Sequence, residues 1–551
     1  MTFLTPLVGA AGQHRWAKRG AALAAGLAAA LANPPFGLLA GLLGYAAILW
    51  LADHAEPTRP ARSAFLRGWL AGAGYFAVST WWVGEAFFVN AKEHGWMAPI
   101  AVILPAGGLA LFWGAAAALY RLTAPAGAWR LLAFAGVFAA AEWLRGHLLT
   151  GFPWDLPGET WKAGSAPSQA ASLVGAYGLT WITLAIVAAP GLGFRARGAR
   201  IALALAAMGL AGLYGFGAWR LAGAASAPDQ GAPLVRVVQP DTPERPSYDA
   251  ASFADVVHRN LSLTTQVGAR APDVILWSEA GIPAALDDYL APGTWTRAEI
   301  EAALRPGQTL MTGGYRGELA PPGAYPPGGL LYHNSLIALT RTADDLAVTA
   351  IYDKYRLVPF GEYLPLDRYL APLGVKQLIH VGDGFTPGPA PRPISPPGVP
   401  TLQPLICYES LFPGFTRDGA RAAGRRPAWI VNVSDDAWFG FTSGPWQHLN
   451  LASYRAIEEG LPMVRATPTG ISAVIDAYGR VLPGKQLGQG AFGAIDARLP
   501  PALTPTVFEG CGNLPFLAML LISLATYASK ARATLRRNGQ AALPVATEQR
   551  L

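Results

Sequence analysis

Three short segments in the second half of the chain each place one reactive side chain in a distinctive sequence context. The first begins at Asp273, and its Val-Ile-Leu-Trp stretch leads to Glu279, which Gly281 and Pro283 follow. Active sites in α/β sheets tend to lie at the ends of strands. Glu279 is therefore a candidate site carboxylate, although a solvated glutamate that merely ends a strand would give the same pattern.

Lys354 and Glu362 frame the second segment. They enclose an apolar Leu-Val-Pro-Phe-Gly turn, which is unusual in a charged surface loop. An ammonium group beside a reacting carbonyl can stabilise the negative charge that develops on its oxygen. The alternative, above all for Glu362, is a salt bridge that closes the loop.

Cys407 ends the third segment, Leu402–Ile406, and Tyr408 and Glu409 follow it. A lone cysteine at a strand end is most often a small buried hydrophobe, whereas the two polar neighbours favour a nucleophile. The chain has 2 cysteines, the other being Cys511. This number excludes a disulfide scaffold and a cysteine-based zinc site. A bridge between the two would contradict the nucleophilic interpretation.

Together the three segments form a workable catalytic set. A cysteine attacks as a thiolate, so an ordinary thiol needs an adjacent base. Glu279 can accept the thiol proton, and Lys354 can offset the charge on a tetrahedral intermediate. The product would be a thioester acyl-enzyme, which a second nucleophile resolves.

This order of glutamate, lysine and cysteine resembles that of the nitrilase, or carbon–nitrogen hydrolase, superfamily. Within it, the chain resembles the apolipoprotein N-acyltransferase family over nearly its whole length, apart from about the first dozen and the last twenty residues. The matching motifs are Val358–Pro365, Ile406–Glu409, Asn432–Gly440, Arg465–Asp476, Gly74–Phe76, Trp143–Gly146 and Thr150–Trp154.

That resemblance implies a role for each candidate residue. Glu279, Lys354 and Cys407 match the base, the oxyanion-stabilising lysine and the nucleophile of the family. The residues that match positions supporting or adjoining the family's active site are Asn334, Glu362, Tyr408, Glu409 and Trp438. Tyr248 stands near where the family has a tryptophan, so it keeps an aromatic ring for substrate binding but puts an indole-specific role in doubt.

The resemblance also implies the reaction. A phospholipid, typically phosphatidylethanolamine, donates its sn-1 acyl chain to Cys407, and the α-amine of the diacylglyceryl-cysteine of an apolipoprotein then takes it. No metal or organic cofactor is required, a monomer suffices, and the setting is a Gram-negative inner membrane. One alternative is a membrane-anchored amidase or nitrilase that releases its acyl group to water. Another is a transporter or receptor without chemistry, in which replacing Cys407 changes nothing.

Strands and helices must bring these segments together. β-rich runs predict strands at Leu234–Gln239, Asp273–Trp277, Thr309–Gly313, Ser335–Leu339, Thr401–Cys407 and Trp429–Val433. The pattern predicts helices near 249–268 and 445–459, and loops over 320–329 and 386–400. Such alternation indicates an α/β domain, which the resemblance makes a nitrilase-like α-β-β-α sandwich over residues 220–510.

The remainder of the chain reads as a membrane α-helical bundle. Eight transmembrane helices are predicted from apolar stretches near 20–33, 37–52, 68–90, 97–119, 130–149, 170–192, 200–219 and 513–529. The first two fall short of the roughly 20 residues that a span needs, and Pro34 and Pro35 between them predict a tight helical hairpin. Residues 1–219 would hold seven spans, and residues 511–551 the eighth span with a tail.

Basic residues set the orientation of these spans. They cluster in alternate loops, as Arg59, Arg62 and Arg67 do between the second and third stretches. By the positive-inside rule both termini are cytoplasmic and the α/β domain lies outside the cytoplasm, in the compartment that the resemblance makes the periplasm. Glu142 and Arg145 lie three residues apart in the fifth stretch, so they could pair on one helical face. Ionisable groups at this depth are substrate-binding candidates, unless Arg145 only snorkels to the interface.

The composition supports a membrane protein. Of the 551 residues, 52% are hydrophobic and 14% charged, whereas soluble proteins carry about 25% charged residues. The net charge of +7 comes from basic residues beside the apolar stretches. No basic arm with interleaved aromatic residues supports nucleic-acid binding.

Overall fold

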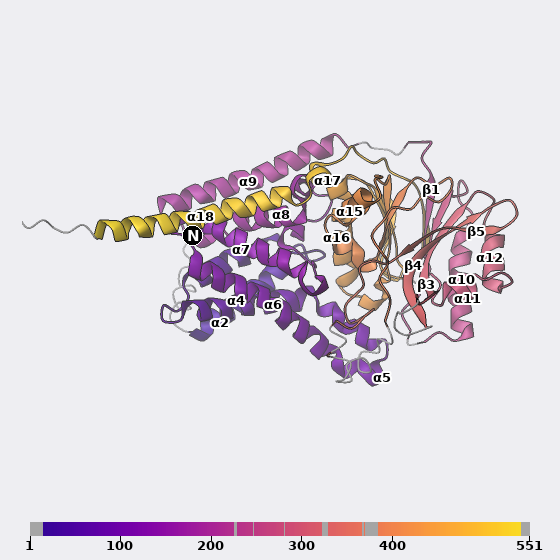
Figure 1. Cartoon of the computed structure of the whole chain (residues 1–551), viewed down its shortest axis with the longest axis horizontal. Coiled ribbons are helices and arrows are strands. Elements are labelled where there is room, and N and C mark those ends of the chain that lie inside the picture. The colour runs from indigo at the N-terminus through magenta and orange to yellow at the C-terminus, as the bar shows by residue number, and fades with distance from the viewer. Residues whose placement is uncertain are drawn as a thin grey trace, which may run out of the picture.

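The chain forms a helical region and an α/β domain at opposite ends of the long axis of the molecule (Figure 1). The computed structural model describes residues 15–224, 229–245, 247–279, 281–321, 329–365, 369 and 384–541. The main helices of the helical region are α2 (Arg15–Ala30), α3 (Leu43–Asp53), α4 (Pro60–Ser79), α6 (Ala98–Thr123), α7 (Arg130–Arg145), α8 (Ala171–Val187), α9 (Arg197–Ala222) and α18 (Leu514–Ala541).

Among the described residues, a helix coincides with each of the eight predicted apolar stretches. The predicted break after the first stretch is confirmed, because α2 ends at Ala30 and α3 begins only at Leu43. Within the part of the chain that the structure describes, three helical segments are long and apolar enough to cross a membrane, namely Ala91–Thr123, Pro167–Val187 and Arg197–Ala222. Leu39–Asp53 and Leu514–Tyr527 are apolar but shorter. The number of eight spans therefore stays a prediction.

The third helix begins and ends earlier than the third apolar stretch predicts. This helix, α4, starts at Pro60, where the fixed φ of proline suits the first turn of a helix, and it ends at Ser79. A 3-10 helix, Trp81–Phe88, replaces the predicted continuation. Arg62 and Arg67 consequently lie inside α4 rather than in a loop. Arg67 is buried and donates to the carbonyl oxygens of residues 51 and 54, at 2.7 Å each.

Two twisted sheets face each other in the α/β domain. The first has the strand order β11-β1-β2-β3-β4-β5 and the second β10-β9-β8-β7-β6. The strands are β1 (Leu234–Gln239), β2 (Val274–Leu276), β3 (Thr309–Leu319), β4 (Leu330–Arg341), β5 (Leu346–Asp353), β6 (Leu402–Ile406), β7 (Trp429–Val433), β8 (Met463–Ala466), β9 (Ser472–Ile475), β10 (Val481–Leu487) and β11 (Gly493–Arg498). Strands β1, β2 and β3 run parallel, and so do β6, β7 and β8.

Side chains alternate between a core inside the two sheets and cores outside them. Leu276 and Val433 point inward, where the two sheets share one apolar cluster. Ile275 points outward under α10 (Ala250–Thr264) and α12 (Trp295–Ala303). Ile430 points outward under α15 (Phe415–Ala422) and α16 (Gly444–Glu459). The result is the predicted α-β-β-α sandwich (Figure 1).

All six predicted strands exist, and β1 and β7 have the predicted bounds. The predicted helices correspond to α10 and α16. The loop over 386–400 contains no described helix or strand, while most of the loop over 320–329 lies outside the described residues. Strand β5 and the strands from β8 to β11 have no counterpart among the predicted strands.

Helix α16 joins the α/β domain to the helical region. Every one of its residues except Trp446 is buried. Tyr454 donates to the carbonyl oxygen of Gly158 at 3.1 Å, and Asn450 to that of Glu159 at 2.9 Å. Because both acceptors lie in the loop between α7 and α8, the outer helical layer of the sandwich is also the docking surface for the helical region.

Candidate active site

The predicted reactive residues all follow the last residue of a strand. Glu279 comes three residues after β2, and Lys354 directly follows β5. Cys407 directly follows β6 in the opposite sheet. The three side chains approach one another from both sheets, since Lys354 contacts Glu279 and both charges act on the Cys407 thiol.

Carboxylates surround the Lys354 ammonium. Its Nζ donates to Glu279 Oε1 at 3.1 Å and to Glu362 Oε1 at 2.8 Å. Asn334 bridges the same two carboxylates, since its Nδ2 donates to Glu279 Oε1 and to Glu362 Oε1, at 2.7 Å each. The salt bridge that sequence analysis weighed as the alternative for Glu362 thus exists, and it lies inside the site.

The charge on Lys354 is stable although the side chain is only 1% exposed. Burial alone would lower the pKa of Lys354, but the Glu279 and Glu362 carboxylates outweigh burial and hold that pKa well above its ordinary value. The group is therefore an ammonium at neutral pH. A fixed positive charge in a water-poor site is suited to stabilise a developing oxyanion.

Cys407 has a left-handed backbone conformation that residues other than glycine rarely adopt. Its φ is 47°, and it begins the 3-10 turn Cys407–Leu411. Burial and the neighbouring Glu279 carboxylate raise the pKa of the thiol, against the opposing effect of Lys354. The resting thiol is thus protonated, and a reaction at sulfur requires a base close by. Among the described residues both cysteines are free, so the bridge with Cys511 that would contradict this role is not formed.

Glu409 organises the backbone around the nucleophile. Its Oε2 accepts from the amide of Ile406 at 2.8 Å, and its Oε1 from the amide of Tyr355 at 2.7 Å and from the hydroxyl of Tyr352 at 2.9 Å. Burial raises the pKa of Glu409 to about 7, although these amides favour the ionised form. The carboxylate ties the end of β6 to the loop after Lys354.

The helical region supplies part of the wall behind Cys407. Tyr408 donates to the carbonyl oxygen of Gly151, and Arg356 donates to that of Thr150 at 3.2 Å. Leu149 and Thr150 have φ values of 52° and 78°. This turn after α7 is therefore held from the α/β side.

Glu142 and Arg145 of α7 hold the same turn from the side of the helical region. Both are only 1% exposed, and Arg145 Nε donates to Glu142 Oε2 at 2.8 Å. Trp113 donates to the other oxygen of Glu142, and Arg145 donates to the carbonyl oxygen of Phe152. The predicted pairing is present, while substrate binding by this pair stays a prediction.

Tyr248 and Trp438 lie toward the outside of the site. Trp438 is 42% exposed, in the 3-10 turn Asp436–Phe439. Tyr248 is half-buried, and burial, together with the neighbouring Glu244 and Asp435 carboxylates, raises the pKa of its phenol. Their predicted roles near substrate stay predictions.

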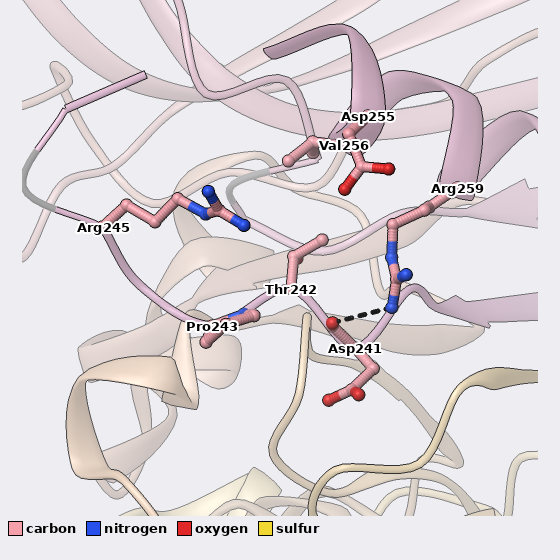
Figure 2. Close-up of a pocket in the computed structure, with 7 residues that line it drawn as sticks. All are labelled: Asp241, Thr242, Pro243, Arg245, Asp255, Val256 and Arg259. Carbon is pink, nitrogen blue, oxygen red and sulfur yellow. Dashed lines mark hydrogen bonds between the residues drawn. The ribbon is translucent and has the colours of Figure 1, made fainter. Parts of the chain in front are cut away.

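The loop that leads to Tyr248 borders a separate small pocket of about 220 Å³. Arg259 of α10 reaches the main chain of this loop, donating to the carbonyl oxygen of Asp241 at 3.0 Å (Figure 2). Thr469 donates to the carboxylate of Asp241 at 2.7 Å. Arg259 and Thr469 therefore hold this loop. None of the predicted site residues lines the pocket, so the pocket is separate from the candidate chemistry.

No role was predicted for Asp435, which lies within the matching motif Asn432–Gly440. The amide of Asp435 donates to Glu279 Oε2 at 2.8 Å, so it fixes the second oxygen of the candidate base. Burial and the Glu244 and Glu279 carboxylates hold the pKa of Asp435 well above its usual range. The sequence did contain a clue to this role. Ser434 directly follows β7 just as Cys407 directly follows the adjacent parallel strand β6, so the residues after the two strands lie at the same edge of the sheet.

The whole arrangement fits nucleophilic acyl transfer through sulfur. Glu279 is an oriented proton acceptor, Lys354 a buried cation and Cys407 a thiol in a strained turn. Among the described residues no cluster of three or more histidine, cysteine, aspartate and glutamate side chains is arranged to hold a metal ion.

Two family models match the chain. The model described as the apolipoprotein N-acyltransferase N-terminal domain covers residues 25–189, and the carbon-nitrogen hydrolase model covers residues 234–505. The first corresponds to the helical region and the second to the α/β domain.

Curated relatives match over nearly the whole chain. An apolipoprotein N-acyltransferase of Caulobacter vibrioides is 57% identical over 512 residues, which are 93% of this chain and 94% of that protein. The enzyme of the same name from Rhodopseudomonas palustris is 37% identical, over 92% of this chain and 94% of that protein. Among solved structures, a mutant of the Nesterenkonia amidase from the nitrilase superfamily covers 56% of this chain and 98% of its own, with 18% identity and a TM-score of 0.32.

Proposed function

Because this chain belongs to the apolipoprotein N-acyltransferase family and so acts in lipoprotein maturation, we propose that Cys407 carries the acyl group between the two substrates. The observation that supports this role best is the convergence of Glu279, Lys354 and Cys407 from two sheets. The lysine charge and the strained cysteine turn are both built before any substrate arrives.

In the first half-reaction the thiol attacks the sn-1 ester carbonyl of a phospholipid such as phosphatidylethanolamine. Glu279 takes the thiol proton as the sulfur–carbon bond forms. Lys354 faces the oxyanion of the tetrahedral intermediate. The carbon–oxygen bond then breaks, Glu279 returns the proton to the leaving alkoxide, and a lysophospholipid departs from the thioester.

In the second half-reaction the neutral α-amine of the diacylglyceryl-cysteine attacks the thioester. Glu279 accepts one amine proton, and Lys354 again stabilises the oxyanion. Collapse breaks the carbon–sulfur bond, and the proton passes to the Cys407 thiolate. An amide leaves, and the thiol is restored.

Several residues support these steps without reacting. Glu362 and Asn334 hold Lys354 and Glu279 in register through bonds of 2.7–2.8 Å. Glu409 holds the turn of Cys407, and Tyr408 fastens it to the helical region. We assign substrate contact to Tyr248 and Trp438, which lie at the exposed side of the site.

The same proposal gives the chain eight spans, seven in residues 1–219 and the last in residues 511–551. Both termini lie in the cytoplasm and residues 220–510 in the periplasm, with the chain in the inner membrane. An impermeant maleimide should then label the exposed Cys511 from outside in a Cys407→Ser background. A cysteine introduced by Ala546→Cys, with Cys511 replaced by serine, should stay unlabelled until the membrane is opened. The reverse pattern would invert the topology.

Intact mass spectrometry tests the chemistry. Purified wild type and Cys511→Ser should gain one acyl mass from phosphatidylethanolamine, whereas Cys407→Ala should not. A diacylated lipopeptide with a free N-terminal amine should then discharge the adduct. No adduct on wild type would overturn the role of Cys407. An adduct that water discharges as fast as the lipopeptide does would support the amidase-like alternative.

A further inference from the structure

Three polar side chains lie behind the nucleophile in the geometry of a serine–histidine–aspartate relay. Ser410 Oγ lies 3.0 Å from His448 Nε2, and His448 Nδ1 lies 2.9 Å from Asp436 Oδ1. Their exposed fractions are 0%, 1% and 1%. The acyl-transfer steps use none of them, so their joint burial requires another reason.

The relay is not a second nucleophilic site. A serine nucleophile must reach a substrate carbonyl, but the Ser410 hydroxyl is enclosed by the protein. It is also directed at the carbonyl oxygen of Cys407, 2.8 Å away. The acceptor of this hydrogen bond belongs to the proposed nucleophile itself, which points to a role in its geometry.

Asp436 determines which nitrogen of His448 carries the proton. Arg465 donates to both carboxylate oxygens of Asp436, at 2.9 and 2.7 Å. Although burial opposes ionisation, Arg465 and His448 hold the pKa of Asp436 below its ordinary value. Burial and the Arg465 charge lower the pKa of His448, so the ring is neutral. Its proton sits on Nδ1, facing the carboxylate, because a carboxylate only accepts.

Nε2 of His448 is then an acceptor. It lies 3.0 Å from the Ser410 hydroxyl and 3.3 Å from the carbonyl oxygen of Cys407. The single hydroxyl proton is shared between His448 Nε2 and the Cys407 carbonyl oxygen in a three-centre hydrogen bond, which holds the Ser410 hydroxyl between the two acceptors. A chain of fixed polarity therefore runs from Arg465 through Asp436 and His448 to the backbone of the nucleophile.

The Cys407 peptide needs such a restraint. A positive φ of 47° is unfavourable for a residue that carries a Cβ. A peptide unit is planar, so a hydroxyl that fixes the Cys407 carbonyl also fixes the Tyr408 amide on the opposite edge. Because rotation of this plane changes ψ of Cys407, the hydroxyl helps to hold the turn that carries the thiol.

We propose that Ser410, oriented by His448, is a positioning residue that keeps Cys407 in its left-handed conformation and aims the thiol at the acyl carbonyl. This role rests on the proposed function of Cys407 as the nucleophile. It predicts a defect in the rate of thiol attack and none in donor binding.

The test compares two deletions of a buried hydroxyl. Ser410→Ala removes the bond to Cys407, whereas Ser453→Ala removes a 2.7 Å bond to the Leu449 carbonyl on α16, away from the nucleophile. The measured quantity is the single-turnover rate of Cys407 acylation against phosphatidylethanolamine concentration. Ser410→Ala should lower the saturating rate about tenfold, the scale of one lost oriented hydrogen bond. The half-saturating donor concentration should not change. Ser453→Ala should change neither quantity.

Two replacements of His448 test the orientation step. His448→Gln places an amide near the position of Nε2 and can still meet the Ser410 hydroxyl, while His448→Asn reaches only toward Asp436. The glutamine variant should therefore retain more of the acylation rate. Alkylation of Cys407 by iodoacetamide, measured in a Cys511→Ser background, should slow in the same order.

Either of two outcomes would overturn the inference. One is a saturating rate in Ser410→Ala equal to that of the wild type. The other is an equal rate loss in Ser410→Ala and Ser453→Ala, with matching losses in thermal stability, which would reflect packing alone. A wild type without any adduct would instead refute the proposed function. In that case the iodoacetamide rates still decide whether Ser410 orients the thiol.

Discussion

At the scale of single residues, the site depends on charge held where water is scarce. Lys354 keeps its ammonium form because two carboxylates outweigh the effect of burial on its pKa. Glu362→Gln removes one of them, so the pKa of Lys354 should fall. Because the ammonium is lost as pH rises through that pKa, the alkaline decline of the acylation rate should move to lower pH.

The measurement is the single-turnover acylation rate of wild type and Glu362→Gln between about pH 6 and 10. Glu299→Gln is the matched control, because this carboxylate lies on α12 and pairs only with His258 at 3.2 Å among the described residues. Superimposable profiles for wild type and Glu362→Gln would show that Glu362 does not hold the charge on Lys354.

For Glu279, the candidate base, the size of the loss in the acylation rate can be predicted. Both oxygens of Glu279 are engaged, one by Lys354 and Asn334 and the other by the amide of Asp435. Glu279→Gln preserves the shape but cannot accept the thiol proton. Acylation of Cys407 should slow by about 10²–10⁴-fold, the usual contribution of a general base. Mass spectrometry of the adduct over time measures this rate, and a loss under tenfold would assign the proton to another group.

At the scale of elements, α16 carries charged residues into a fully packed environment. Glu459 is 1% exposed, and one of its carboxylate oxygens has no partner among the described residues. Burial and the adjacent Glu458 and Glu509 raise the pKa of Glu459 from 4.5 to about 8. Its ionisation therefore opposes folding.

The sign of the pH effect follows from that raised pKa. The folded chain holds the proton of Glu459 more tightly than the unfolded chain does, so wild type loses stability as pH rises from 4.5 to about 8. Glu459→Gln lacks this loss. Its stability advantage should grow by at most about 1.4 kcal/mol per pH unit in the window. Thermal unfolding in detergent at pH 5 and pH 8 measures it, and an advantage independent of pH would contradict the assignment.

Glu142 and Arg145 of α7 form a buried ion pair, so removing one of these charges should have a different effect on stability from removing the charge of Glu459. Arg145→Gln leaves the Glu142 carboxylate buried without its partner, which should destabilise the chain by about 3–5 kcal/mol. The double variant Glu142→Gln with Arg145→Gln removes both charges and should recover part of this loss. Thermal unfolding of Glu142→Gln, Arg145→Gln and the double variant measures the coupling free energy between the two side chains. Additive effects would mean that the pair makes no net contribution.

Local pattern was enough to predict the strands that lead to Glu279 and Cys407, because each apolar run is adjacent in sequence to the polar residue that follows it, but it did not predict β5, which ends directly before Lys354. Local pattern was not enough to predict the hydrogen bonds that connect the site residues. Asn334 reaches Glu279 across 55 positions, and Asp435 across 156. Register between strands distant in the chain creates those bonds. The helix near 445–459 was predicted, but not the burial of its charged side chains, which results from docking against another region.

At the scale of the molecule, this docking makes the α/β domain dependent on the helical region. Tyr454 and Ile457 of α16 belong to the apolar core of the helical region, together with residues of α7 and α8. Arg455 pairs with Glu159 of that region at 3.1 Å. The amide of Ala176 in α8 donates to Glu458 Oε1 at 2.7 Å. One helix thus supports the site and fills the interface at once.

The α/β domain produced alone, as residues 229–510, should therefore fail to form a soluble monomer. Removing the helical region exposes Tyr454, Ile457 and the charges that were paired across the interface, and a contiguous apolar face of this kind promotes association. Size-exclusion chromatography should find aggregate. The same isolated domain with Tyr454→Ser and Ile457→Gln should yield more soluble protein, because the new face is polar. A monodisperse, folded domain with the wild-type sequence would show instead that the sandwich is autonomous and that the helical region serves only to bring lipid to it.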